Sequence, residues 1–329
     1  MPGRKILVTG AAGFIGSHVA HALLARGASV VALDHFDTFY DPALKRTNIR
    51  ELERAAAESG SPFRLVERDI RDEEAMRILF ERERFDGVIH LAARAGVRPS
   101  IAEPALYASV NVFGTTVLLE AARRAGCGRF VCASSSSVYG NNSKVPFAES
   151  DPVDHPISPY AATKKACELI GHTFHHLYGM PTAMLRFFTV FGPRQRPDLA
   201  ISLFMRNISR REPIPVFGDG SMSRDYTYID DIVAGVIAAY ERIPSHGYRV
   251  WNLGGNRPVT LRDMIRSVER TLGIKAIIDP RPTPPGDVER TYADLKRSAA
   301  ELGFNPSTDF EAGLARQWDW MRSAASRAD

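Results

Sequence analysis

A tyrosine and a lysine four residues apart suggest acid–base chemistry. Tyr160 and Lys164 lie near the start of a predicted helix, for which Ser158 is the expected N-cap and Pro159 the first helical residue. Residues four apart share one helical face, and an ammonium beside a phenol stabilises the phenolate and lowers its pKa. We therefore expect Tyr160 to act as a general base near neutral pH, supported by Lys164.

Hydroxyl groups follow an apolar, strand-like stretch at residues 129–134. Ser135, Ser136 and Ser137 come directly after it. Side chains that end a core strand face the ligand crevice of an open parallel sheet. If the segment stays extended, Ser135 and Ser137 point to the same side. We expect these serines to lie in the catalytic site.

A glycine-rich turn after the first predicted strand points to a dinucleotide. The run Gly10-Ala11-Ala12-Gly13-Phe14-Ile15-Gly16 separates strand 5–9 from an amphipathic helix predicted at 16–26. Its glycines allow a tight turn, close approach of a pyrophosphate and close helix–strand packing, and the helix N-terminus attracts phosphate. Asp34 ends the next strand and can hydrogen-bond the adenosine ribose. Because its charge repels the extra phosphate of NADP, and His35 rather than an arginine follows, we expect NAD.

The elements that must position these groups alternate between strand and helix. Strands are predicted at 5–9, 29–34, 63–70, 87–93, 129–134 and 180–190, with helical segments between them. This order predicts an α/β fold, a Rossmann-type doubly wound parallel sheet with helices on both faces. A helix at 229–242 and a strand at 249–253 follow, and the proline-rich stretch 280–286 is predicted to be a loop or linker. We assign residues 1–188 and 229–256 to the NAD-binding domain, and 189–228 and 257–329 to a smaller C-terminal α/β substrate-binding domain.

Taken together, these motifs resemble the extended short-chain dehydrogenases/reductases, specifically the nucleotide-sugar epimerase/dehydratase group. The resemblance covers nearly the whole chain, and the motifs stand in the order typical of that family. The matching elements are Gly10/Gly13/Gly16, Asp34, His90–Ala93, Ser134–Gly140, Tyr160/Lys164, Gly192–Arg194 and Arg224–Tyr226.

The resemblance implies further roles around the cofactor. Lys164 would also bind the nicotinamide ribose, and Ser135 would hydrogen-bond the sugar hydroxyl that is oxidised. Asp69 and Ile70 resemble an adenine-edge contact, although Asp69 could equally be the N-cap of the next helix. The segment after the fourth strand, Leu91, Ala92 and Ala93, belongs to the same expected cofactor site.

The resemblance also separates reactions within the family. Related dehydratases and decarboxylases carry an acid just before the Val-Tyr-Gly motif, whereas this chain has Ser136 and Ser137 there. Without that acid, we expect reversible oxidation at carbon 4 of a UDP-sugar, rotation of the keto sugar and reduction from the other face. Two alternatives stay open: a net dehydrogenase, and a non-catalytic NAD-sensing or scaffold module.

Several details resemble UDP-glucuronate 4-epimerases. They are the run Thr189–Ala200, the run Ala95–Arg98 and the run Lys144–Phe147, with Phe191 and Leu199 as conservative departures from the commoner tyrosine and methionine. By the same resemblance, we expect Arg98, Arg224 and Arg290 to bind the pyrophosphate. We expect Thr189 and Arg196, assisted by one of the serines 135–137, to bind the sugar carboxylate, although Arg196 could instead be a loop arginine paired with Asp198. A UDP-glucose/UDP-galactose 4-epimerase is the alternative.

Composition and charge are those of a globular protein that binds a small anion. The chain has 42 basic and 38 acidic residues among 329, so its net charge is +4, without basic clusters. We therefore expect no nucleic-acid partner, and we expect no metal and no membrane partner. Three cysteines that fit no metal spacing favour a reducing cytoplasm. By resemblance, the protein is expected to form a homodimer through helices near 104–124 and 160–178.

Overall fold

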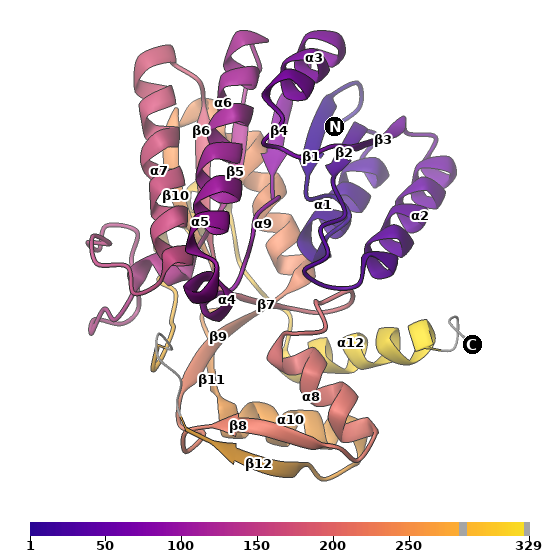
Figure 1. Cartoon of the computed structure of the whole chain (residues 1–329), viewed down its shortest axis with the longest axis vertical. Coiled ribbons are helices and arrows are strands. Elements are labelled where there is room, and N and C mark those ends of the chain that lie inside the picture. Colours follow the sequence, from indigo (N-terminus) through magenta and orange to yellow (C-terminus); the bar gives the residue numbers. More distant parts are fainter. Residues whose placement is uncertain (283–287, 326–329) are drawn as a thin grey trace.

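A seven-stranded, fully parallel sheet forms the larger part of the molecule (Figure 1). The computed structural model describes residues 1–282 and 288–325. The strand order is β10-β6-β5-β4-β1-β2-β3, so the direction of winding reverses between β1 and β4. Ligands of open parallel sheets bind at the carboxyl ends of the strands beside such a reversal. The strands are β1 (Lys5–Thr9), β2 (Ser29–Asp34), β3 (Phe63–Glu67), β4 (Gly87–His90), β5 (Phe130–Ser135), β6 (Thr182–Phe187) and β10 (Tyr248–Leu253).

Helices pack on both faces of this sheet, as the strand–helix alternation predicts. Side chains alternate along β1, so that Leu7 joins one apolar core and Ile6 and Val8 join the other. The fold class is therefore confirmed. One face carries α1 (Phe14–Ala25), α2 (Pro42–Ser59) and α9 (Ile229–Arg242); the other carries α3 (Glu73–Glu83), α6 (Gly114–Arg124) and α7 (Pro159–Tyr178).

The segment between β4 and α6 is helical but irregular. It contains α4 (Val97–Ala102), α5 (Pro104–Tyr107) and a π-helix at Ala108–Phe113. Together, residues 104–124 form a helical run long and apolar enough to cross a membrane by length and composition, the only such run among the described residues. Because 56% of its apolar window is buried inside the protein, this is weak evidence for a membrane span.

A smaller part lies below the carboxyl ends of the large sheet in Figure 1. It has a three-stranded sheet of order β11-β9-β7 and a parallel pair, β12-β8. Helix α12 packs against α10, β7 and β9. The elements are β7 (Thr189–Phe191), α8 (Ala200–Ser209), β8 (Pro213–Phe217), β9 (Ser223–Tyr228), β11 (Pro258–Thr260), α10 (Leu261–Leu272), β12 (Ile277–Arg281) and α12 (Phe310–Ala325).

Three predicted strands were too long. The strand expected at 180–190 divides at Phe188, where β6 ends and β7 leaves the large sheet to pair in parallel with β9. The strands expected to reach Ile70 and Ala93 end at Glu67 and His90. The backbone NH groups of residues 91 and 92 instead donate to the Thr9 hydroxyl at 3.2 Å. The residues beyond the true strand ends are those that line the cavity described below.

The proline-rich stretch was only partly a loop. Pro280 and Arg281 belong to β12, which pairs with β8 in a two-stranded sheet. Proline is tolerated there because an edge strand need not donate every backbone hydrogen bond. The rest of the predicted loop, up to Gly286, includes residues 283–286, which lie outside the described residues.

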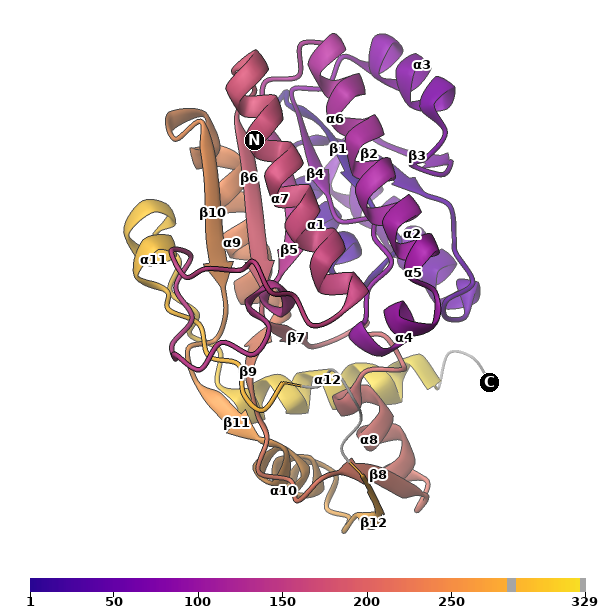
Figure 2. The ribbon, with the colours of Figure 1, turned by 60° about the vertical axis from the view of Figure 1, so that its left-hand side comes forward.

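The predicted domain division follows the sheets, and it stays a prediction. Residues 1–188 and 229–256 contain the large sheet and its helices, while β7, β8, β9, β11 and β12 fall in the other two segments. Helix α11 (Lys296–Leu302) belongs to the second set by sequence, but it packs against α9 and β10 (Figure 2).

Candidate active site

A cavity of about 390 Å³ opens at the carboxyl ends of the large sheet's strands. Its wall comes from the loops after β1, β2, β3, β4, β5 and β6, together with the start of α7. The structure brings eighteen predicted site residues together here: Gly10, Gly13, Phe14, Ile15, Gly16, Asp34, Asp69, Ile70, Leu91, Ala92, Ala93, Ser135, Ser136, Ser137, Tyr160, Lys164, Thr189 and Arg196.

The glycine-rich turn has a different steric need at each glycine. Gly10 has φ +66°, and a Cβ there would lie 2.7 Å from the backbone nitrogen of Ala92. A Cβ on Gly16 would lie 2.0 Å from the Gly10 carbonyl oxygen, so a side chain at either position would break the turn. A Cβ on Gly13 would meet only that carbonyl, at 3.2 Å. The turn thus leaves backbone open to the cavity at Gly13 and begins α1 there, as a pyrophosphate requires.

Asp34 links the end of β2 to this turn. Its buried carboxylate accepts hydrogen bonds from the backbone NH of Ala12 at 3.0 Å and of Phe36 at 2.9 Å. The same carboxylate lines the cavity. A fixed negative charge there accepts ribose hydroxyls and repels a ribose phosphate. The turn and Asp34 together therefore fit NAD.

Asp69 does not cap the following helix, so the prediction that it could be the N-cap was wrong. The N-cap of α3 is Asp72, whose carboxylate accepts from the Ala75 NH at 3.0 Å. Asp69 accepts instead from the backbone and guanidinium of Arg71. Burial opposes ionisation of Asp69, but the hydrogen bonds from Arg71 hold the pKa of Asp69 below its usual range. The carboxylate lines the cavity and is available as an adenine-edge contact.

Tyr160 and Lys164 project from the first turns of α7, which begins as predicted. The Ser158 hydroxyl caps the helix by accepting from the Ala161 NH at 3.1 Å, and Pro159 is the first helical residue. Buried Lys164 donates to the carbonyl of Ala133, at the end of β5, at 2.7 Å. Its Nζ lies 6.0 Å from the centroid of the Tyr160 ring. The helix and the strand end thus fix a phenol and an ammonium side by side in the cavity wall.

The three serines reach the cavity through a different backbone shape from the one expected. Residues 136–139 form a 3-10 turn, so Ser135 and Ser137 do not share the side of an extended strand. The turn nevertheless brings them together, because the Ser135 hydroxyl donates to the Ser137 hydroxyl at 3.0 Å and accepts from its NH at 3.2 Å. A ligand hydroxyl near one therefore lies near the other.

Arg196 and Thr189 enter the cavity from the segment after β6. Arg196 also forms the ion pair with Asp198 that the sequence spacing allows: Nε and one terminal nitrogen donate to the two carboxylate oxygens at 3.0 and 2.7 Å. The Arg196 side chain, which is only 16% exposed, therefore pairs with Asp198 and lines the cavity at the same time.

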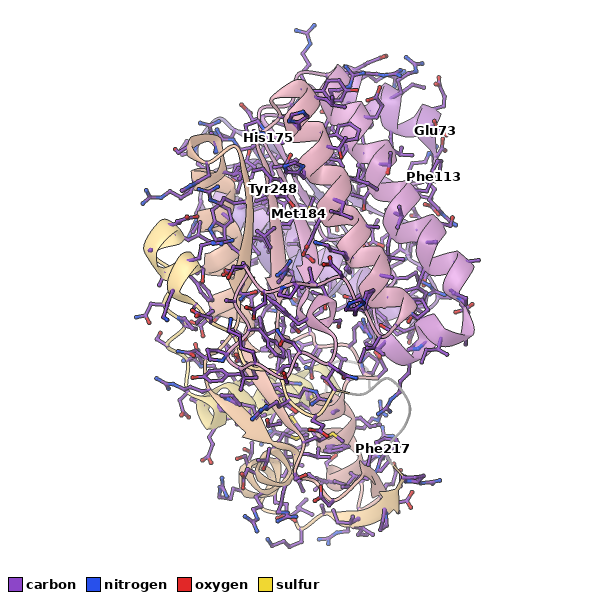
Figure 3. The ribbon with its side chains drawn as sticks, turned by 90° about the vertical axis from the view of Figure 1, so that its left-hand side faces the viewer. Glu73, Phe113, His175, Met184, Phe217 and Tyr248 are labelled. Atoms are coloured by element: carbon purple, nitrogen blue, oxygen red, sulfur yellow. The ribbon has the colours of Figure 1, made fainter. Side chains whose placement is uncertain are left out.

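The other three predicted arginines lie outside this cavity. Arg98, in α4, stacks on the Phe217 ring of β8 with 4.3 Å between the guanidinium carbon and the ring centroid; Figure 3 shows Phe217 in the smaller part. Arg224 and Arg290 lie on neighbouring segments, because Ser223 and Arg290 form a β-bridge. The backbones of these two residues therefore lie on adjacent segments, with Arg224 on β9, the central strand of the three-stranded sheet.

Sequence reasoning missed one side of the cavity. Asp37, Phe39, Tyr40 and Lys45 line it from the loop between β2 and α2, and Arg94 lines it from the loop after β4. Arg94 donates to the Asp37 carboxylate at 2.7 Å, and Lys45 donates to the Asp37 carbonyl at 2.6 Å. The clustering of aromatic and charged residues directly after Asp34 was the available signal.

Polar groups elsewhere in the core serve the structure. His90 lies between the hydroxyls of Thr9 and Thr115, at 2.7 and 3.0 Å, and burial lowers its pKa to about 3. The three cysteines are buried, and burial raises the pKa of the Cys127 thiol to about 11. Among residues 1–282 and 288–325, no group of three His, Cys, Asp or Glu side chains could hold a metal ion.

A phenol and an ammonium fixed beside a dinucleotide crevice support hydride chemistry at a hydroxyl-bearing carbon. This arrangement on a doubly wound sheet defines an extended short-chain dehydrogenase/reductase. Comparison with family models narrows the class: residues 7–317 match the model described as GDP-mannose 4,6 dehydratase, and the chain belongs to that family.

Individual relatives cover nearly the whole chain. UDP-glucuronate 4-epimerase 4 of Arabidopsis thaliana is 44% identical over 338 residues, which is 98% of this chain and 76% of that protein. The crystal structure of UDP-glucuronic acid 4-epimerase from Bacillus cereus, in complex with UDP-glucuronic acid and NAD, is 36% identical with a TM-score of 0.89 and covers 97% of this chain and 99% of that one. A UDP-glucose 4-epimerase from Thermotoga maritima, with UDP-glucose, is 34% identical with a TM-score of 0.87 and covers 98% and 99%.

Proposed function

We propose that this protein is an NAD-dependent UDP-sugar 4-epimerase that interconverts UDP-glucuronate and UDP-galacturonate. The observation that carries the proposal is the position of Arg196, which lines the same cavity as Tyr160, Lys164 and the serines. A guanidinium there gives a sugar carboxylate a charge-assisted partner within reach of the reacting carbon. The epimerases named for UDP-glucuronate among its relatives support this choice.

The cofactor is held by groups already in place. The backbone around Gly13 and the N-terminus of α1 receive the pyrophosphate, Asp34 receives the adenosine ribose, and Lys164 receives the nicotinamide ribose. NAD, when bound, supplies a hydride acceptor that returns the hydride in the second half of the reaction. Leu91, Ala92 and Ala93 line the same crevice with small or apolar side chains.

Tyr160 is the group that moves the proton. Its phenolate takes the proton of the carbon 4 hydroxyl during oxidation and gives it back during reduction. Lys164 keeps a positive charge beside the phenolate, and Ser135 and Ser137 hydrogen-bond the oxygen that changes between hydroxyl and ketone. These roles use the two hydroxyls as one pair, because they contact each other at 3.0 Å.

The cavity wall favours epimerisation over elimination. Positions 136 and 137, between the catalytic strand end and the Val-Tyr-Gly motif, carry serines instead of an acid. The carboxylates that line the cavity are Asp34, Asp37 and Asp69, and each already accepts hydrogen bonds from the protein. The cavity wall that the structure describes therefore offers no carboxylate free of protein hydrogen bonds to act as the acid for a leaving hydroxyl.

A uronate substrate adds one requirement. Oxidation at carbon 4 makes a β-keto acid, which tends to lose carbon dioxide when the breaking bond aligns with the ketone. Arg196 and Thr189, with one of the serines 135–137, hold the carboxylate out of that alignment. Arg98, Arg224 and Arg290 bind the pyrophosphate of the UDP-sugar; the β-bridge between Ser223 and Arg290 supports this only in placing the backbones of the last two on adjacent segments.

The deciding experiment compares two substrates. The purified protein is incubated with UDP-glucuronate and with UDP-glucose, and products are resolved by NMR. We expect UDP-galacturonate to form much faster than UDP-galactose, without net NADH. Equal or faster conversion of UDP-glucose would support the neutral-sugar epimerase, and stoichiometric NADH would support a net dehydrogenase.

The assembly and the compartment also belong to the proposal. Phe113, Leu169, Leu177 and Tyr178 are large apolar side chains 42–60% exposed on the π-helix before α6 and on α7; Figure 3 shows Phe113 on the outer side of these helices. Covering them by a second copy supports a homodimer through the helices at 104–124 and α7. Three buried, unpaired cysteines support a cytoplasmic location.

A further inference from the structure

Phe39 contacts two arginines that come from different loops. The guanidinium carbon of Arg196 is 5.0 Å from the centroid of the Phe39 ring, and that of Arg94 is 5.1 Å away. All three side chains line the cavity, Phe39 from the loop after β2, Arg94 from the loop after β4 and Arg196 from the segment after β7. One aromatic ring thus connects three walls of the site.

Arg196 therefore has two neighbours that restrain it, the Phe39 ring and the Asp198 carboxylate. The Asp198 carboxylate takes the edge formed by Nε and one terminal nitrogen. Asp198 is 45% exposed and does not line the cavity, whereas Arg196 is 16% exposed and does. Contact with the Phe39 ring adds a second restraint on the guanidinium besides the ion pair with Asp198.

Phe39 is itself fixed from the cofactor side of the cavity. Its backbone NH donates to the Asp37 carboxylate at 2.8 Å, and the same oxygen accepts from Arg94 at 2.7 Å. This segment begins at Asp34, whose carboxylate is the expected ribose contact. The chain that receives the cofactor therefore also carries the ring against which Arg196 rests.

We infer that Phe39 is a positioning residue for uronate recognition: it presets the Arg196 guanidinium for the sugar carboxylate. The inference rests on the proposed function. A prearranged guanidinium loses little freedom when a carboxylate binds, so its full charge-assisted bond contributes to affinity. A neutral sugar lacks the carboxylate, so it gains nothing from this arrangement, and Phe39 should affect uronate binding selectively.

The test measures dissociation constants by calorimetry, in NAD-loaded protein carrying Tyr160→Phe so that substrate is not turned over. Phe39→Leu keeps an apolar side chain but removes the aromatic face, and Phe39→Tyr restores that face. We expect Phe39→Leu to raise the dissociation constant for UDP-glucuronate about threefold to tenfold, the scale of one cation–π contact. The dissociation constant for UDP-glucose should stay the same within about twofold. Phe39→Tyr should restore the original affinity.

Two comparisons separate positioning from general damage. Arg316→Gln removes a cation–ring contact outside the cavity, in which the guanidinium carbon lies 5.5 Å from the Tyr228 ring centroid, and should change neither dissociation constant. In an Arg196→Gln background, Phe39→Leu should cause no further selective loss, since the group it positions is gone. In the otherwise unmodified enzyme, Phe39→Leu should also increase release of the decarboxylated 4-keto-pentose.

The outcomes distinguish this inference from the proposed function. If the Tyr160→Phe protein binds the uronate no better than UDP-glucose, the proposed function fails and this inference with it. If the Tyr160→Phe protein prefers the uronate, but Phe39→Leu weakens the binding of both ligands equally or of neither, only the inference about Phe39 is overturned. Failure of Phe39→Tyr to restore affinity would overturn it as well, because the ring would then not be the cause.

Discussion

The ammonium group of Lys164 donates to the Ala133 carbonyl at 2.7 Å, and this hydrogen bond fixes the position of the ammonium charge. Held by β5, the ammonium stays near the Tyr160 ring without hydrogen-bonding the phenol in place of substrate. The Tyr107 ring stands nearly perpendicular to the Tyr160 ring, with 6.2 Å between the two centroids. Tyr160 and Lys164 therefore both contact neighbours that lie outside the proposed proton transfer.

Replacing Tyr160 by Phe should reduce turnover by about 10² to 10⁴-fold, the usual scale of general acid–base catalysis. The change removes the proton-transfer group but almost no volume, so the unfolding midpoint should stay the same. Steady-state epimerisation and thermal unfolding measure the two effects. Tyr248→Phe is the control, since its hydroxyl donates to the Glu168 carbonyl outside the cavity and should leave turnover intact. Near-normal turnover in Tyr160→Phe would mean that another group takes the proton.

Ser135 and Ser137 should be partly redundant, because each hydroxyl lies within reach of the same ligand oxygen. Losing one neutral hydrogen bond costs about 0.5 to 1.5 kcal/mol, so either alanine variant should lower kcat by about twofold to tenfold. The double variant should lose more than the product of the two single losses. Kinetics of the three variants decide this, and a single Ser137→Ala that abolished turnover at unchanged stability would contradict it.

At the scale of elements, a buried ion pair fixes α7 against the sheet. Glu168, one turn after Lys164, accepts two bonds from Arg186 of β6, each 2.8 Å, and one from the Ser134 hydroxyl of β5 at 2.7 Å. Both charged side chains are 2% exposed. The carboxylate thereby sets the register between the helix that carries Tyr160 and the strand that leads to Ser135.

Glu168→Gln should destabilise the protein by about 3 to 5 kcal/mol, because it leaves the Arg186 charge buried without its partner. Denaturant unfolding measures this. Glu120→Gln is the matched control: Glu120 also pairs with arginines, but at 32% exposure, and its loss should cost less than about 1 kcal/mol. Equal losses for the two variants would show that α7 does not depend on this pair.

The bounds of an element could be predicted where nearby residues determine them, and could not where they depend on contacts between distant segments. Helix 229–242 and the Ser158 cap of α7 were right to the residue, since periodicity and capping are local signals. The departure of β7 from the large sheet depends on pairing with β9, more than thirty residues away. The stacking of Phe39 on Arg94 and Arg196 likewise joins distant loops. No local pattern encodes such meetings, so the cavity's motifs were foreseen and its aromatic–arginine wall was not.

At the scale of the whole molecule, two histidines buried on folding link stability to pH. Burial, assisted by nearby Arg194, lowers the pKa of His18 to about 3, and burial with Lys164 nearby lowers that of His90 to about 3. The His18 ring hydrogen-bonds the Pro193 carbonyl, and the His90 ring lies between two threonine hydroxyls. The unfolded chain protonates these rings near pH 6.5, whereas the folded chain does not.

The free energy of unfolding should therefore be fully retained above about pH 6.5 and should fall as the pH decreases towards 3. Each histidine contributes up to about 1.4 kcal/mol per pH unit in that window, because the unfolded state binds one more proton. His18→Gln, which retains a side-chain donor for the Pro193 carbonyl, should reduce the slope between pH 6 and 4 by about that amount. Denaturant unfolding at several pH values measures the slopes. Exposed His155→Gln is the control and should leave the slope unchanged. An unaltered slope in His18→Gln would show that His18 takes up its proton without unfolding.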